Sequence, residues 1–79
     1  MDDRADTSTA VKAVDVVLEG GPMDLPDLLR RQRVDPVEYD IKVHHRGGYE
    51  HFVRTTEWSY RHGTPRIVYR WSFRTRIAE

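Results

Sequence analysis

Hydrophobic and polar positions alternate most regularly in the segment Arg66–Ile77, RIVYRWSFRTRI. Large β-forming side chains occupy every second position, and arginines occupy most positions between them. A period of two predicts a half-buried β-strand. Because this strand carries the densest apolar face in the chain, we expect the other elements to cover that face.

The same alternation predicts three earlier strands, over Ala13–Glu19, Val37–His44 and Tyr49–Arg61. Glycine-rich turns separate them. Gly47-Gly48 predicts a hairpin between the second and third strands, and residues 63–65 (Gly-Thr-Pro) predict a turn into the last strand.

A short helix is predicted between the first two strands. Asp24 is a suitable N-cap, Pro26 fits the first turn, and arginines follow towards the end, which suits the helix dipole. Leu25, Leu28 and Leu29 have the spacing of an apolar stripe. We therefore expect two to three helical turns packed on one face of the sheet.

Together these elements predict an α+β fold with the order β-α-β-β-β. It comprises an antiparallel three-stranded meander, an N-terminal strand and one short helix on one face. Residues 1–10 are polar and predicted to be a disordered tail, and residues 11–79 form one small domain. The place of the N-terminal strand in the sheet is left open by the sequence.

Two-residue loops at both turns would send the same side of the middle strand inward, which supports the meander. This register places Val43 opposite Phe52 and Trp58 opposite Tyr69. The predicted core is Val14, Val16, Leu18, Leu25, Leu28, Leu29, Tyr39, Ile41, Phe52, Trp58, Tyr69, Trp71 and Phe73.

Composition narrows the class of protein. The 79 residues carry no net charge and no cysteine, so disulfides and thiolate metal sites are excluded. No apolar run has the length of a membrane helix, and the acidic N-terminus does not resemble a signal peptide. We therefore expect a cytoplasmic protein that does not bind membranes.

Charge is unevenly distributed along the chain. Residues 1–40 have a net charge of −5, whereas residues 41–79 have +5 and hold all four histidines. Such asymmetry fits two halves that pack on each other, head-to-tail dimers, or a half that binds polyanions.

The predicted outer sheet face is basic near the Gly47-Gly48 turn. Lys42, His44 and Arg46 are candidate anion contacts there. The predicted register puts no aromatic side chain on this face, although sheet proteins that bind single strands stack bases on aromatic rings. Nucleic-acid binding is therefore the secondary expectation.

A histidine pair and an inward-pointing arginine are two further candidate ligand sites. His44 and His51 face each other in this register, but two ligands do not make a metal site, and we predict none. Arg54 points inward, where a structural ion pair with Asp15, Asp24 or Asp27 is expected over a ligand-facing role.

Catalytic machinery is not predicted. The three serines (Ser8, Ser59 and Ser72) lack the context of an activated nucleophile, and Gly20-Gly21 lacks the pattern of a phosphate-binding loop. We expect no enzyme activity and no cofactor.

Three short motifs nevertheless resemble a known family. They are LEGGPMDLP (residues 18–26), GGYEHF (residues 47–52) and YRWSFRTRIAE (residues 69–79). Their order and spacing resemble a family of small actinobacterial proteins of unknown function. The resemblance implies a gene context near secondary-metabolite biosynthesis, and it implies no mechanism.

The sequence thus favours a non-catalytic protein-interaction or accessory module, whose partner is another protein or a second copy. The alternative is a nucleic-acid-binding or regulatory protein that uses the basic face. The predicted partner-binding residues, all near the Gly47-Gly48 turn, are Tyr49, Glu50, His51, Arg74 and Arg76.

Overall fold

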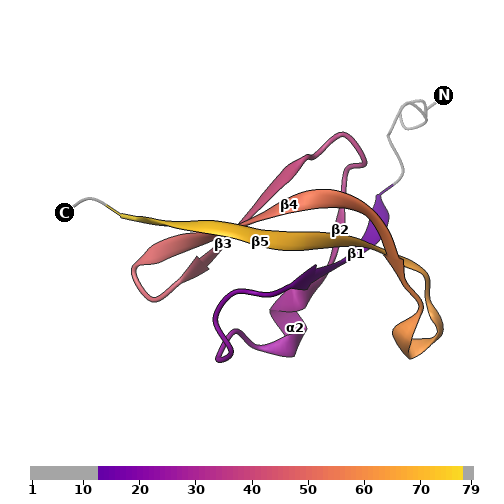
Figure 1. The fold of residues 1–79 in the computed structure, drawn as a ribbon, viewed down its shortest axis with the longest axis horizontal. Helices are drawn as coiled ribbons and strands as arrows, with labels where there is room; N and C mark the ends of the chain where they lie inside the picture. The colour runs from indigo at the N-terminus through magenta and orange to yellow at the C-terminus, as the bar shows by residue number, and fades with distance from the viewer. Residues whose placement is uncertain (1–12, 78–79) are drawn as a thin grey trace, which may run out of the picture.

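The computed structural model describes residues 13–77, so the tail predicted over residues 1–10 lies outside the described residues. Five strands form a single mixed sheet with one short helix (Figure 1). The elements are β1 (Val14–Glu19), α2 (Asp27–Arg30), β2 (Arg31–Val34), β3 (Asp40–His45), β4 (Gly48–Ser59), the 3-10 turn η2 (Arg61–Gly63) and β5 (Arg66–Arg76).

The strand order is β2-β1-β5-β4-β3, with β1 parallel to β5 and the other pairs antiparallel. The predicted antiparallel meander is therefore confirmed as β3-β4-β5. The N-terminal strand also forms, and it lies beside β5 in the interior of the sheet. The predicted order is incomplete, because it lacks β2.

The predicted two- to three-turn helix is wrong. Only Asp27–Arg30 is helical, and Arg31–Val34 instead forms β2, antiparallel to β1. Leu25 is buried, but Leu28 and Leu29 are 77% and 39% exposed. Pairing with β1 satisfies the backbone groups of this segment, and that pairing outweighs the helical spacing of its leucines.

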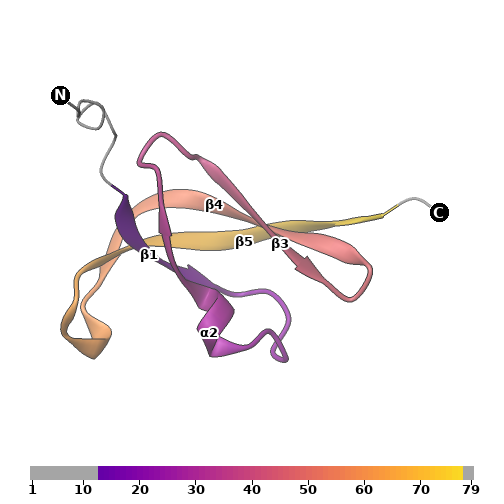
Figure 2. The same ribbon diagram turned by 180° about the vertical axis from the view of Figure 1, so that it is seen from behind.

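The sheet curls so that one of its faces is concave and encloses the core. Figure 2 shows this curl where β3 crosses β5. The buried cluster joins Val16 and Leu18 on β1 to Ile41 and Val43 on β3, although two strands separate β1 from β3 in the sheet. Its other members are Leu25, Phe52, Ile67 and Tyr69. We call this concave side the inner face and the opposite side the outer face.

The first hairpin turns one residue earlier than predicted. Arg46 and Gly47 both have positive φ, 50° and 75°, as a type I′ turn requires. Ile41 therefore lies opposite Phe52, and Lys42 lies opposite His51. The predicted pairing of Val43 with Phe52 and of His44 with His51 is wrong.

A β-bulge in β5 changes which side chains share a face. His51 pairs with Phe73 and Phe52 pairs with Trp71, so Ser72 has no partner on β4. An extra residue in one strand of a pair reverses the side-chain alternation beyond it. Phe73 and Thr75 consequently lie on the outer face, and Arg74 and Arg76 on the inner face.

A second irregularity lies further along β4, between Arg54 and Trp58. The Thr55 hydroxyl donates to the carbonyl of Val68 (2.6 Å) and accepts from the amide of Glu57 (3.0 Å). Such side-chain bonds stabilise a break in the ladder. Trp58 therefore pairs with Ile67, and the predicted pairing with Tyr69 is wrong.

These changes also correct the predicted core. Val16, Leu18, Leu25, Ile41, Phe52 and Tyr69 are buried as predicted, and Val14 packs at the edge of the cluster. Val43 and Ile67 belong to the core but were not predicted. The predicted core members that are instead exposed are Leu28, Leu29, Tyr39, Trp58, Trp71 and Phe73.

Candidate functional site at the free end of β5

A buried carboxylate organises the inner face near the first hairpin. Glu50 is 2% exposed and accepts hydrogen bonds from Trp71 Nε1 (2.8 Å) and Arg74 Nη1 (2.5 Å), and its Oε2 lies 3.2 Å from Nδ1 of His45. Burial alone would raise the pKa of Glu50. The hydrogen bonds from Trp71, Arg74 and His45 outweigh burial, and its pKa is lowered.

The cluster extends through His45 to the loop before α2. His45 Nε2 lies 3.2 Å from a carboxylate oxygen of Asp24, whose other oxygen accepts from Arg46 Nε at 2.6 Å. The hydrogen bond from Arg46 lowers the pKa of the Asp24 carboxyl.

Arg74 is a structural residue in this cluster. Besides Glu50, its guanidinium donates to the carbonyls of His45 (2.9 Å) and Arg46 (2.6 Å), which lie at the hairpin turn. These contacts tie the end of β5 to the turn between β3 and β4.

The outer face carries an aromatic surface that the predicted register excluded. Phe73 stacks on His51 with ring centroids 4.2 Å apart and planes 9° apart. His51 also lies within hydrogen-bond distance of Asp40 (3.3 Å) and Thr75 (2.9 Å). Phe73 is 47% exposed, so half of its ring surface remains accessible.

Tyr49 extends this surface along β4. Its ring lies 5.5 Å from that of His44, and the Lys42 ammonium lies 5.6 Å from its centroid. The prediction that the outer face has no aromatic side chain is therefore wrong. Tyr49 lies on this face with His51, and the bulge at Ser72 turns Phe73 onto it.

The predicted site residues thus divide between two faces. Tyr49, His51, Lys42 and His44 share the outer face, whereas Glu50, Arg74 and Arg46 form the inner cluster. Arg76 lies opposite Gly48, beyond Arg74 on the inner side. Within residues 13–77, no group of three His, Asp or Glu side chains is placed to hold a metal ion.

Arg54 does not form the expected ion pair. Its guanidinium donates to the carbonyl of Pro36 (2.6 Å), while Asp15 and Asp24 pair with Arg33 and Arg46. The neighbouring Tyr69 hydroxyl donates to the Glu38 carbonyl (2.5 Å). Burial raises the pKa of Tyr69, an effect that the Arg54 charge partly opposes. Both side chains therefore fasten the loop between β2 and β3.

The sequence did not reveal one structural contact that shapes this site. Gly20 and Gly21 cross β5 at Trp71, and a Cβ at Gly21 would lie 2.7 Å from Trp71 Cδ1. The glycine pair ends β1, and its lack of side chains also leaves room for the indole ring of Trp71. A pair of glycines followed by a distant tryptophan gives no pattern from which this contact could be found.

The outer half of β5 has a free backbone edge. β1 pairs with β5 only as far as Arg70, and from Trp71 to Arg76 the described partner of β5 is β4 alone. All residues from Arg70 to Ile77 are exposed. Figure 1 shows this end of β5 extending away from β1 towards the C-terminus. We call residues 72–76 the β5 edge.

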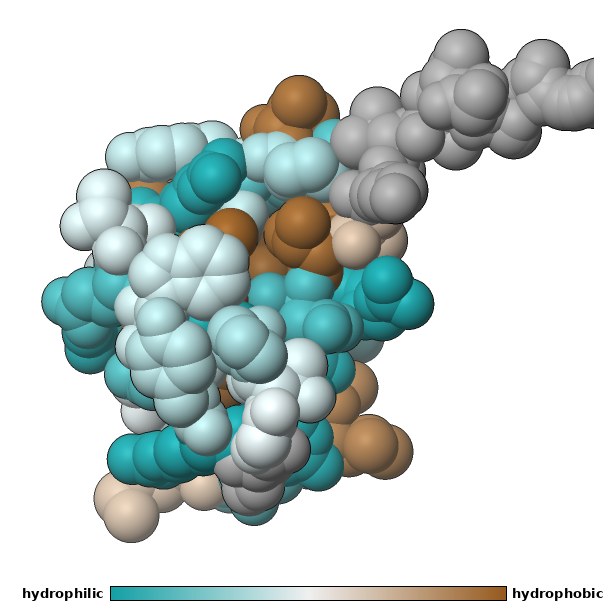
Figure 3. Space-filling model, turned by 90° about the vertical axis from the view of Figure 1, so that its right-hand side faces the viewer, coloured by the Kyte–Doolittle hydropathy of each residue, from teal (hydrophilic) through white to brown (hydrophobic). Residues whose placement is uncertain are grey.

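Apolar side chains are otherwise scattered over the surface. Figure 3 shows several separate hydrophobic areas between hydrophilic ones on the face it presents. No helix within residues 13–77 is long and apolar enough to cross a membrane.

The chain belongs to DUF5988, a family of unknown function whose model matches residues 10–79. No curated protein and no solved structure matches it.

Proposed function

We propose that this DUF5988 member is a non-catalytic protein-interaction module that binds an extended segment of a partner protein along the β5 edge. The observation that carries the proposal is that residues 73–76 pair with β4 on one side and with no described strand on the other. An unpaired strand edge presents backbone donors and acceptors that an added strand can use.

The hairpin fixes which backbone groups are available. The amide of Ile77 donates to the carbonyl of Gly47 at 3.1 Å, on the β4 side. Backbone groups of alternate residues in a strand point to opposite sides. The N–H and C=O groups of Arg74 and Arg76 therefore point to the free edge, where a partner strand would meet them.

Side chains beside the β5 edge determine which residues a partner segment would need. On the outer face it meets the exposed ring of Phe73, and on the inner face it meets the Arg76 guanidinium. We therefore expect an extended segment with an apolar residue on one face and a carboxylate on the other.

The other two edges of the sheet suit this role less well. β2 has four residues, and Arg31 and Arg33 project from it. Charged residues project outward from β3 at Asp40 and Lys42. A short strand such as β2 and projecting charges such as those of β3 are usual protections against strand addition. On the β5 edge, the Arg74 guanidinium is held by Glu50 and the hairpin carbonyls.

The resemblance to actinobacterial proteins supplies the biological setting of the proposal. On that setting we propose an accessory protein near enzymes of secondary-metabolite biosynthesis, and we propose that it acts in the cytoplasm. A second copy of the chain is the alternative occupant of the same edge.

A photo-crosslinking amino acid in place of Phe73 tests the proposal in the native cell. The matched control replaces Tyr60, which is 70% exposed at the far end of β4. We expect a nuclease-resistant protein adduct from position 73 and not from position 60. An adduct with a second copy would identify a homodimer, and equal adducts from both positions would contradict the proposal.

The outer face supports a second candidate function, the binding of single-stranded nucleic acid. Phe73 and Tyr49 are exposed stacking surfaces, and Lys42 lies beside Tyr49. Stacking on such rings contributes about 1–3 kcal/mol per base. Binding to an oligonucleotide that weakens steeply with salt, and weakens further in Phe73→Ala, would favour this function over the first.

A further inference from the structure

We infer that Arg66 and Arg31 form a binding site for an oxyanion group, a phosphate or a carboxylate, on the outer face across β1. The site lies on the half of the sheet that holds β2, remote from the β5 edge. It is independent of the proposed function, and each can fail without the other.

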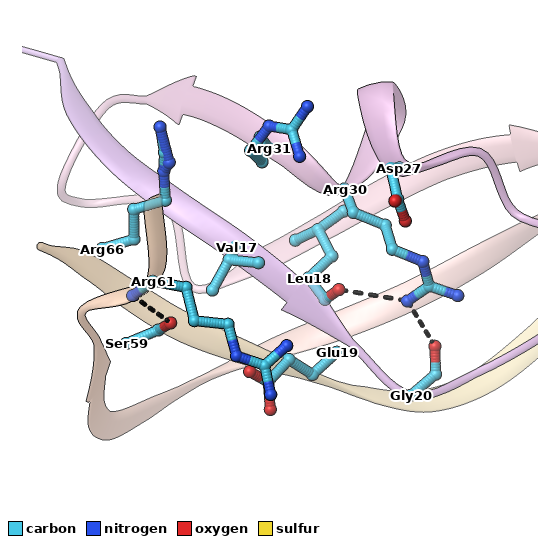
Figure 4. Close-up of a pocket in the computed structure, with 10 residues that line it drawn as sticks. All are labelled: Val17, Leu18, Glu19, Gly20, Asp27, Arg30, Arg31, Ser59, Arg61 and Arg66. Carbon is cyan, nitrogen blue, oxygen red and sulfur yellow. Dashed lines mark hydrogen bonds between the residues drawn. The ribbon is translucent and has the colours of Figure 1, made fainter. Parts of the chain in front are cut away.

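Two adjoining hollows mark the site, with volumes of about 270 and about 250 Å³. Arg31 and Arg66 line both of them. Arg31 projects from β2 and Arg66 from the start of β5, so β1 runs between the two side chains (Figure 4).

Arg66 supplies the observation that points to a ligand. Its Nε and Nη1 atoms are buried, and neither has a hydrogen-bond partner among residues 13–77. Buried guanidinium N–H groups without acceptors are unfavourable, and charged donors raise this cost. An oxyanion offers acceptor oxygens and a compensating charge in one group.

Most other charged groups around the hollows already have partners. Asp27 also lines the first hollow, and in Figure 4 it lies near Arg30, on the far side from Arg66. Arg30 donates to four backbone carbonyls, those of Leu18, Gly20, Pro22 and Leu25, so it fastens the loop before α2. Arg33 pairs with Asp15 at 3.4 Å. Glu19 pairs with Arg70 at 3.5 Å. In Figure 4 the Arg61 head group points away from that of Arg66.

The oxyanion has two sources that share this chemistry. One is a free or partner-borne phosphate group. The other is a carboxylate of the acidic N-terminal sequence, which contains Asp2, Asp3 and Asp6 and lies outside the described residues. The experiment must therefore compare the full chain with a variant whose N-terminal aspartates are neutral.

The test is a titration of the full ¹⁵N-labelled chain with inorganic phosphate at constant ionic strength, followed by the arginine Nε–H signals. We expect saturable shifts at Arg66. Arg66→Gln should weaken phosphate binding at least tenfold, whereas Arg76→Gln, at the far end of β5, should change it less than twofold. Should Arg66→Gln fail to fold, Arg31→Gln should still weaken binding at least threefold.

The triple variant D2N/D3N/D6N separates the sources. Phosphate binding to the unaltered chain with unchanged affinity in the triple variant identifies an external oxyanion. Binding that appears or tightens only in the triple variant identifies the tail carboxylates as the resident group. Absence of saturable binding in both chains, or equal binding in Arg31→Gln and the unaltered chain, would overturn the inference.

Discussion

Replacement of Glu50 with alanine is the most informative stability experiment on the inner face. The substitution removes the acceptor shared by Trp71, Arg74 and His45. Leaving buried donors unsatisfied costs about 1–3 kcal/mol, and more when a charged group is involved.

The structure limits the expected loss. Arg74 retains the carbonyls of His45 and Arg46, and Trp71 is 40% exposed, so water reaches part of its ring. We therefore expect Glu50→Ala to lower the free energy of unfolding by about 2 kcal/mol. For a chain of this size, that corresponds to a fall in Tm of about 8–16 °C.

Glu57→Ala is the matched control. Glu57 pairs with Arg70 on the surface, and its side chain is 60% exposed. An exposed ion pair usually contributes about 0.5 kcal/mol, so we expect a Tm change of about 2–4 °C. Thermal unfolding followed by circular dichroism measures both variants. A Glu50→Ala protein that melts within 2 °C of the unaltered chain would refute the role assigned to this carboxylate.

The same residue predicts a pH dependence. The pKa of Glu50 is lower in the folded protein than its ordinary value of 4.5. The unfolded chain therefore binds more protons in this range, so stability is full above pH 4.5 and falls as the pH drops through the folded pKa. Urea unfolding between pH 3 and 6 should show a shallower acid loss for Glu50→Gln, and identical profiles would contradict the assignment.

Three substitutions, two of them with a matched control, test the remaining features by thermal or urea unfolding. Gly21→Ala should destabilise by about 1–3 kcal/mol, because its Cβ would lie 2.7 Å from an indole carbon at φ 79°; an unchanged Tm would contradict this packing. Arg30→Lys should cost about 2 kcal/mol through its lost carbonyl contacts, whereas Arg31→Lys should stay within about 0.5 kcal/mol. Leu25→Ala should cost about 2–5 kcal/mol and Leu28→Ala under about 0.5 kcal/mol, and equal losses would refute the one-turn helix.

Sequence periodicity predicted four of the five strands, because it reports which residues alternate, and it missed β2. The meander of β3, β4 and β5 and the N-terminal strand follow from that signal. The glycines also located the hairpin, although the turn uses Arg46 and Gly47. Shifting a two-residue loop by one position preserves the inward side of each strand, so most of the core survived this error.

The bulges account for most of the side chains that were predicted on the wrong face. A single unpaired residue, Ser72, reverses the faces of Phe73 and Arg74. Nothing in the sequence marks Ser72 as the site of a bulge, because apolar and polar residues alternate without interruption on both sides of it. The outer face therefore carries Phe73 at this end, and Arg74, predicted on the outer face, lies on the inner face and donates to the buried carboxylate of Glu50.

The helix error has a different cause. Leucines at helical spacing, a capping aspartate and a favourable charge order are local signals. The pairing of Arg31–Val34 with β1 joins segments that residues 20–30 separate in the sequence, and it competes with those local signals. A four-residue strand rich in arginine carries little pattern of its own.

The central claim is that a partner strand uses the backbone of the β5 edge. Arg76→Pro removes the amide donor that faces this edge, and Arg76→Ala removes the side chain but keeps the amide. Both are compared in quantitative capture of the partner identified by crosslinking at position 73, after Tm measurements confirm folding. The account predicts at least a tenfold loss for Arg76→Pro and less than a threefold loss for Arg76→Ala. Equal retention of the partner by both folded variants would contradict it.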